Sequence, residues 1–177
     1  LPGSHAIYNA LAAGAVGHLL GLTGEQIAEG IGKVQSVGGR SHIISLADKT
    51  IIDDCYNANP VSMEAALELL ATANSRKVAI LGDMFELGEN ELALHRRVGA
   101  FAANKAIDLI LCVGTLSQSM YEAAIAQGAQ AKYYNTKEVL LEELPELLKK
   151  GDTILLKASH GMGFSSMIDT MKELQLQ

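Results

Sequence analysis

Short apolar runs alternate with segments of helical periodicity from residue 50 to the end of the chain. The apolar runs lie at 50–54, 77–81, 108–113, 131–134 and 152–157. The helical segments follow them at 61–73, 90–104, 117–127, 137–149 and 164–174. This alternation predicts βαβ units, and therefore an α/β fold with a mostly parallel sheet and helices on both faces. A further β-prone run at 41–46 precedes the first of these runs and predicts an antiparallel hairpin with it.

The first 36 residues have a different pattern. Residues 6–20 predict one helix, and Thr23 opens a second helix that continues to Val34. No strand accompanies these two helices, so we expect residues 1–36 to be the end of another domain. Small and glycine residues then mark a boundary, and the α/β domain is expected to occupy residues 37–177.

Composition and charge exclude several classes of protein. A net charge of −6 argues against nucleic acid as a partner. No apolar run reaches the roughly 18 residues that span a bilayer, and no signal peptide is recognisable, so we expect a cytoplasmic protein with no membrane contact. Cys55 and Cys112 lie far apart, and the histidines show no metal-ligand spacing, so no metal site is predicted. The chain begins without a methionine, and we expect it to be a piece of a longer protein.

Polar segments follow three of the predicted strands. The sequence reads Asp-Asp-Cys-Tyr-Asn-Ala-Asn-Pro at 53–60, Gly-Asp-Met-Phe-Glu-Leu-Gly at 82–88 and Lys-Ala-Ser-His-Gly at 157–161. The carboxyl ends of parallel strands lie at one edge of a sheet, where ligands bind in open α/β folds. We therefore expect these three segments to converge on one ligand.

The residue types in these segments suit a charged ligand. Lys157 and Ser159 suit a phosphate or a carboxylate. The carboxylates of Asp54, Asp83 and Glu86 suit a ribose diol, an ammonium group or a phosphate bridged by Mg²⁺. The GxGxxG, GxxxxGK[ST] and GxSxG motifs are missing, so the sequence predicts no dinucleotide, P-loop or nucleophile-elbow site of its own.

Structural roles are the alternative for several of these residues. Asn59 and Pro60 are typical of the N-cap and first position of a helix. Asp83 is also a suitable turn cap, and Lys157 is also a typical solvated strand end. His95 lies one or two helical turns beyond the acidic segment, from where it can face the cleft.

Five segments together carry a resemblance to a known family. They are LPGSHAIYNALAA at 1–13, GGR at 38–40, DDCYNANPVSM at 53–63, LGDMFELGENELALH at 81–95 and LLKASHGM at 155–162. In these segments and their order, the chain resembles the Mur ligases of peptidoglycan synthesis over essentially its whole length. Within that family it is similar to the C-terminal part of the members that add D-Ala-D-Ala to UDP-N-acetylmuramoyl-tripeptide.

The resemblance implies an activity and a domain organisation. ATP would phosphorylate the peptide carboxylate, and the amine of D-Ala-D-Ala would attack the acyl phosphate. Residues 1–36 would be the last helices of a central ATPase domain, and residues 37–177 a Rossmann-like domain that closes over the nucleotide. The N-terminal domain and the rest of the central domain, with the P-loop and the Mg²⁺ ligands, would lie outside this chain. The fragment alone would therefore be inactive and would supply no catalytic residue.

The resemblance also implies roles for ten residues of this chain. Contacts to ATP would come from Asn9, Arg40, Asp54, Tyr56 and Asn57. Contacts to the peptide substrates would come from Asn59, Asp83, Glu86, Lys157 and Ser159. The sequence departs from the family pattern at Ala6, where an asparagine is usual, and at His160, where an arginine is usual.

Two other interpretations stay open. The first is a sister ligase of the same chemistry that adds a single amino acid or acts on a folate-type substrate. The second is a Rossmann-like binding module without catalytic activity.

Overall fold

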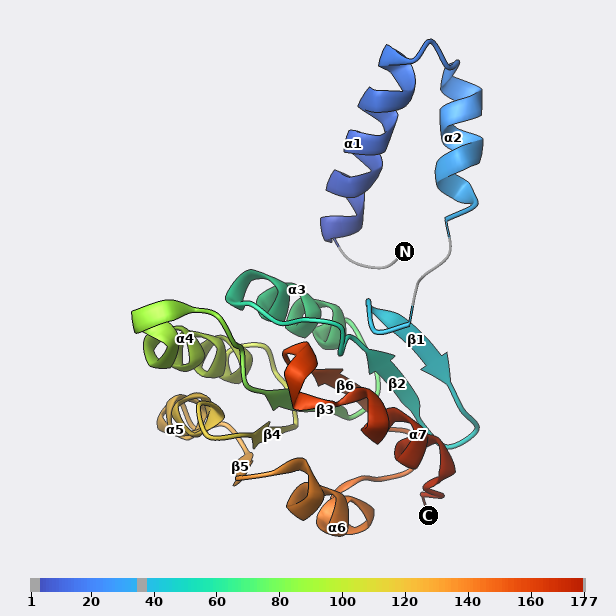
Figure 1. Cartoon of the computed structure of the whole chain (residues 1–177). Helices are drawn as coiled ribbons and strands as arrows, with labels where there is room; N and C mark the ends of the chain where they lie inside the picture. The colour runs from blue at the N-terminus through green and yellow to red at the C-terminus, as the bar shows by residue number, and fades with distance from the viewer. Residues whose placement is uncertain (1–3, 35–37, 177) are drawn as a thin grey trace.

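The computed structural model describes residues 4–34 and 38–176 of the chain. Within them, a helical hairpin precedes an α/β domain (Figure 1). The predicted boundary between residues 36 and 37 lies outside the described residues. The hairpin consists of α1 (Ser4–Leu19) and α2 (Gly24–Gly32), close to the two helices predicted from the sequence.

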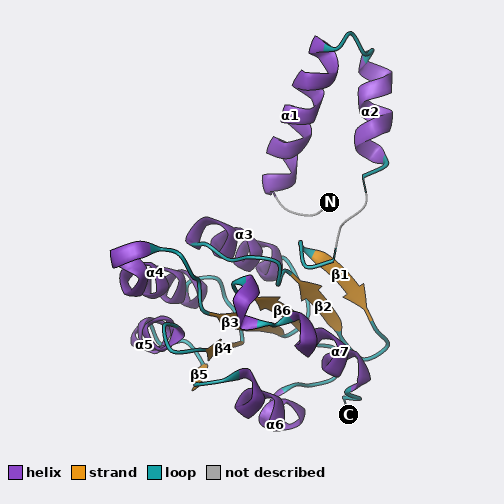
Figure 2. Ribbon diagram, viewed as in Figure 1, coloured by secondary structure: helices purple, strands orange, loops and turns teal. Residues whose placement is uncertain are grey.

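The strands described for residues 38–176 form one six-stranded sheet in the order β1-β2-β6-β3-β4-β5 (Figure 2). They are β1 (His42–Ser45), β2 (Thr50–Asp53), β3 (Lys77–Gly82), β4 (Leu109–Val113), β5 (Ala131–Tyr134) and β6 (Thr153–Lys157). β1 pairs with β2 in the antiparallel direction, and the other neighbouring strands are parallel. The predicted α/β class and the predicted hairpin are both confirmed.

Helices cover both faces of the sheet (Figure 1). One face carries α3 (Pro60–Ala71), α4 (Glu91–Ala103) and α5 (Ser117–Ala126). The other carries α6 (Lys137–Leu147) and α7 (Ser165–Glu173). Two short 3₁₀ helices, η1 (Gly88–Asn90) and η2 (His160–Met162), follow β3 and β6 and were not predicted.

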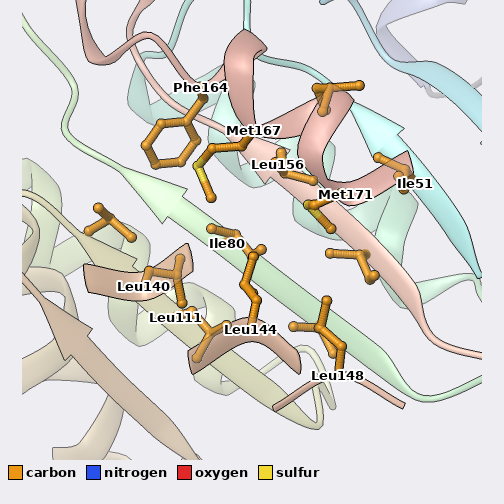
Figure 3. Packing of buried hydrophobic residues seen from close by; sticks show 14 of the residues in the cluster. Ile51, Ile80, Leu111, Leu140, Leu144, Leu148, Leu156, Phe164, Met167 and Met171 are labelled. Atoms are coloured by element: carbon orange, nitrogen blue, oxygen red, sulfur yellow. The ribbon is translucent and has the colours of Figure 1, made fainter. Parts of the chain in front are cut away.

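The core is divided into two layers by the sheet. Successive residues of a strand point to opposite faces, so Ile80 joins one layer and Leu81 the other. Strands that are buried on both faces need apolar residues at nearly every position, which explains the continuous apolar runs of the sequence. Figure 3 shows the layer under α6 and α7, where Leu144 and Met171 pack over Leu111 and Leu156.

Helix α3 begins as its sequence predicts. The Asn59 side chain accepts a hydrogen bond from the Ser62 N–H (2.9 Å), and the Ser62 hydroxyl oxygen accepts one from the Asn59 N–H (3.1 Å). Pro60 follows the N-cap, where its missing N–H costs nothing. The helix therefore starts at a fixed point directly after the polar segment that follows β2.

The helical hairpin has a close contact and an exposed apolar surface. Gly17 of α1 lets Ile27 of α2 approach, because a Cβ at Gly17 would lie 2.9 Å from the Ile27 side chain. Large apolar side chains of α1, among them Leu11 and Leu19, are nevertheless mostly exposed. None of the described helices has the length and apolar character that a membrane span requires.

Candidate functional site

Loops that follow three neighbouring strands border a cleft of about 470 Å³. β6 lies between β2 and β3 in the sheet, so the carboxyl ends of these strands are adjacent. The lining residues are Tyr56, Asn57, Ala58, Asn59, Phe85, Glu86, Leu87, Ser159, His160 and Gly161. Because every one of the three predicted segments contributes to this lining, their expected convergence at one edge is confirmed.

Lys157 and Asp54 form a buried ion pair beside the cleft. The Lys157 Nζ lies 2.5 Å from the Asp54 Oδ2 and donates a second hydrogen bond to the Asn57 carbonyl oxygen (3.0 Å). Lys157 is only 2% exposed. Removing an ammonium group from water is costly unless it is paired in this way. The pair therefore ties the end of β6 to the loop that follows β2.

The carboxylates of the neighbouring residues Asp53 and Asp54 hold a turn at residues 39–41, the Arg40 turn. The Asp53 Oδ2 accepts a hydrogen bond from the Gly39 N–H (2.8 Å). The Asp54 Oδ1 accepts one from the Ser41 N–H (2.8 Å). Hydrogen bonds from backbone donors to ionised carboxylates are stronger than those between neutral groups. Both chain neighbours of Arg40 are therefore fixed to the end of β2.

Arg40 and Tyr56 stack at the exposed rim of this turn. The Arg40 guanidinium carbon lies 4.0 Å from the centroid of the Tyr56 ring, within the range of a cation–π interaction. The Tyr56 N–H donates to the Gly39 carbonyl oxygen (2.9 Å). Gly39 has φ +78°, and a Cβ there would lie 3.3 Å from Tyr56, so a larger residue would be strained at this position. The centroid of the His160 ring lies 6.0 Å from the centroid of the Tyr56 ring.

The Asp83 carboxylate points to helix α5 and not to the cleft. Its Oδ1 accepts hydrogen bonds from the Ser117 N–H and hydroxyl group, each at 2.7 Å. Asp83 is 4% exposed and packs against Gly114, where a Cβ would lie 2.5 Å from the carboxylate. Its carbonyl oxygen accepts the Ser159 N–H (2.9 Å). Asp83 thus links the loops after β3, β4 and β6.

The loop after β3 is held by two further side chains. The Ser159 hydroxyl oxygen accepts the Phe85 N–H (2.8 Å). The Nε2 of His95 accepts the Met84 N–H (2.9 Å), and its Nδ1 lies 2.7 Å from the Glu91 carbonyl oxygen. His95 is fully buried and is not part of the lining, so of the orientations open to it from the sequence it does not take the one that faces the cleft. Its contact with Met84 holds the loop after β3 on the side away from the cleft.

The predicted site residues fall into three groups. Five line the cleft, namely Tyr56, Asn57, Asn59, Glu86 and Ser159. Four others lie outside this lining, and these are Arg40, Asp54, Asp83 and Lys157. Asn9 is exposed on α1, in the helical hairpin.

The apolar part of the lining was not predicted from the sequence. Phe85 is 41% exposed, and its ring lies against Gly161, where a Cβ would be 3.1 Å away. Leu87 lies two residues further along the same loop. The sequence does contain a signal for this, namely an aromatic residue in the loop after a strand, directly before Glu86. The neighbouring Glu86 has φ +61°, an uncommon conformation outside glycine that often occurs at functional sites.

Two kinds of chemistry find no support in the described residues. Burial raises the pKa of the thiols of Cys55 and Cys112, and the Asp53 carboxylate adds to this effect at Cys55. Both thiols therefore stay protonated and unreactive. No group of three His, Cys, Asp or Glu side chains in residues 4–34 and 38–176 is placed to hold a metal ion.

The model of one protein family, described as Mur ligase, glutamate ligase domain, matches residues 39–160. The chain belongs to the Mur ligase family. Its matched residues include all of the lining of the cleft except Gly161. The resemblance noted in the sequence is confirmed at the level of the family.

Similar Mur ligases cover nearly all of this chain. The UDP-N-acetylmuramoyl-tripeptide–D-alanyl-D-alanine ligase of Bacillus subtilis is 35% identical over 98% of the chain, which corresponds to 39% of the relative. A crystal structure of MurF from Acinetobacter baumannii has a TM-score of 0.90 and 32% identity, covering 98% of this chain and 38% of that one. The chain thus spans about two fifths of the length of the relatives it matches.

A third Mur ligase was solved with a nucleotide. The MurF ligase of Thermotoga maritima in complex with ADP has a TM-score of 0.74 and 23% identity, covering 90% of this chain and 36% of that one. At this identity the likeness shows a shared fold.

Proposed function

We propose that this chain is the C-terminal part of an ATP-dependent ligase that joins D-Ala-D-Ala to UDP-N-acetylmuramoyl-tripeptide in peptidoglycan synthesis. The observation that carries the proposal is the 35% identity to an enzyme of that name, which extends over 98% of the chain. The relatives are much longer, so we also propose that N-terminal and central domains precede this part in the same polypeptide. Because such a ligase consumes ATP, we place it in the cytoplasm.

The domain organisation follows from the same likeness. Residues 1–36 would belong to the central ATPase domain and residues 37–177 to the C-terminal domain. The exposed apolar side chains of α1, such as Leu11 and Leu19, support this division, because a central domain would cover them. The C-terminal domain alone would not ligate, since the P-loop and the Mg²⁺ ligands would lie outside this chain.

The nucleotide would bind at the rim formed by the Arg40 turn. Arg40 carries a permanent, forked cation that suits the phosphates of ATP. Within the described part of the chain, the Asp54 Oδ2 accepts a hydrogen bond from Lys157 alone, so it keeps a lone pair for a ribose hydroxyl. Tyr56 and Asn57 lie at the same rim, and Asn9 would reach the base from the hairpin side. The ADP complex of the Thermotoga maritima relative supports a nucleotide as the ligand.

The peptide substrates would bind in the cleft itself. Glu86 is exposed at its edge and suits the ammonium group of D-Ala-D-Ala, while Asn59 and Ser159 offer neutral polar groups. Direct contacts of Asp83 and Lys157 to the substrate stay predictions. In this structure both side chains bind protein atoms. Closure of this domain over the central domain would bring the cleft to the acyl phosphate and exclude water from it.

An assay of the full-length polypeptide tests this function. The protein is incubated with ATP, UDP-N-acetylmuramoyl-tripeptide and D-Ala-D-Ala, and ADP release is measured together with formation of the pentapeptide product. We expect turnover with the dipeptide and none with D-Ala, L-Lys or L-Glu alone. Turnover with a single amino acid would instead identify a sister ligase. The absence of any turnover would favour a binding module.

A further inference from the structure

Lys157 is a buried cation that does not reach the cleft. It is among the largest fully buried side chains of the protein, at 2% exposure. Both of its hydrogen bonds run to the loop after β2, to the Asp54 carboxylate and the Asn57 carbonyl oxygen. A buried ammonium group that bound substrate directly would need an open path to the cleft, but Lys157 is not part of the lining.

A continuous series of contacts leads from Lys157 to Arg40. Lys157 holds the Asp54 Oδ2 at 2.5 Å. The other oxygen of this carboxylate, Oδ1, accepts the Ser41 N–H at 2.8 Å and lies 3.4 Å from the Ser41 hydroxyl group. Ser41 has φ +48°, a conformation that the surroundings must hold in place. Arg40 directly precedes it in the chain.

The position of Arg40 therefore depends on the orientation of the Asp54 carboxylate. Asp53 accepts the Gly39 N–H on the other side of Arg40, so one carboxylate holds each chain neighbour of Arg40. With Lys157 absent, Asp54 would be a poorly hydrated charge without its cation. The Arg40 guanidinium, which stacks 4.0 Å above Tyr56, would then be drawn from that ring to the carboxylate.

We propose that Lys157 is a positioning residue, which orients Asp54 and thereby sets the turn that presents Arg40 to the nucleotide phosphates. The effect on catalysis rests on the proposed function, whereas the effect on the Arg40 turn does not. Lys157 would neither touch ATP nor take part in the chemical steps.

Lys49 provides a matched control for this role of Lys157. Lys49 is also buried, at 3% exposure, and is paired with Asp48 at 3.0 Å. It also donates to the Leu174 carbonyl oxygen. It precedes β2, whereas Asp54 follows that strand, so the two buried pairs lie at opposite ends of β2. Loss of either ammonium group should destabilise the domain, but only loss of Lys157 should move Arg40.

Kinetics of the full-length protein test the proposal through K157M, K157R and K49M. We expect K157M to raise the KM for ATP about tenfold, equivalent to about 1.4 kcal/mol. Its kcat at saturating ATP should stay within about threefold of the wild type. K157R should recover part of the affinity for ATP. K49M should lose about as much thermal stability as K157M but leave the KM for ATP unchanged. Equal KM values for K157M and K49M would overturn the proposal.

A crystal structure of the K157M variant of this chain gives a readout that needs no activity. We expect the Arg40 guanidinium to leave the Tyr56 ring and to approach Asp54. An Arg40 turn that keeps its hydrogen bonds and its place over Tyr56 would overturn the positioning role. A wild-type protein without ATP turnover would contradict only the proposed function, and this crystal structure would still decide the role of Lys157.

Discussion

The loop after β3 keeps its shape because buried side chains accept the backbone N–H groups around it. His95 binds Met84 from one side, and Ser159 binds Phe85 from the other. Asp83 connects the same loop to Ser117. The exposed residues of the cleft thus depend on three buried polar side chains, of which His95 and Asp83 lie outside the lining and Ser159 is part of it.

A substitution of Asp83 should affect stability before it affects ligand binding. D83A would leave the Ser117 N–H and hydroxyl group without their acceptor, which costs about 1–3 kcal/mol of unfolding free energy. E86A, at an exposed position of the same loop, should change stability by less than about 0.5 kcal/mol. Urea unfolding of both variants measures the difference, and equal stability would contradict the structural role of Asp83.

The contact between Tyr134 and Glu143 should make stability depend on pH. The hydrogen bond from the Tyr134 hydroxyl group (2.7 Å), followed by one from Lys132, lowers the pKa of Glu143 below its ordinary value of 4.5. A lowered pKa in the folded state contributes stability above pH 4.5, and this contribution is lost as the pH falls through the folded pKa.

Y134F is the variant that tests this pH dependence. It removes the larger of the two contacts that lower the pKa of Glu143. We expect it to reduce the unfolding free energy more at pH 7 than at pH 3, as measured by urea unfolding at both values. The same loss at both pH values would show that Tyr134 stabilises the domain through packing alone.

Helices α4 and α5 approach each other so closely that one glycine decides their packing. A Cβ at Gly99 would lie 2.0 Å from the Met120 carbonyl oxygen, a backbone atom that cannot turn away. G99A should therefore force the helices apart and lower the unfolding free energy by about 1–3 kcal/mol. G30A in α2 is the control, since nothing lies within 4 Å of a Cβ there, and it should not lower stability. Equal thermal unfolding of the two variants would refute the close contact.

The order and type of the elements were predictable because their signals are local. Each strand is an apolar run, and α3 starts at an Asn59-Pro60 cap that the sequence shows directly. The directions of the polar side chains were not predictable, because their partners are distant in sequence. Asp83 binds a residue 34 positions away, and Lys157 binds one 103 positions away. Asp83 directly follows β3 and Lys157 is the last residue of β6, places typical of ligand-binding residues, yet both side chains bind protein atoms.

The order of strands explains how the whole molecule assembles its site. β6 is the last strand described but lies between β2 and β3, so the cleft combines loops from the start, middle and end of the α/β domain. The Arg40 turn directly precedes β1 and is hydrogen-bonded to Asp53 and Asp54 at the end of β2, so it belongs to the α/β domain. A movement of the domain relative to the hairpin would therefore carry the cleft and Arg40 together, as closure over a nucleotide requires.

The KM for ATP of the full-length R40A and D54A variants tests the nucleotide site most directly. Loss of a charged contact to phosphate or ribose is worth about 1.5–3 kcal/mol, so each variant should raise the KM about tenfold or more. R96A removes an exposed arginine of α4 outside the cleft lining and should leave the KM unchanged. Unchanged kcat and KM in both R40A and D54A would contradict the assignment of this domain to the nucleotide site of a Mur ligase.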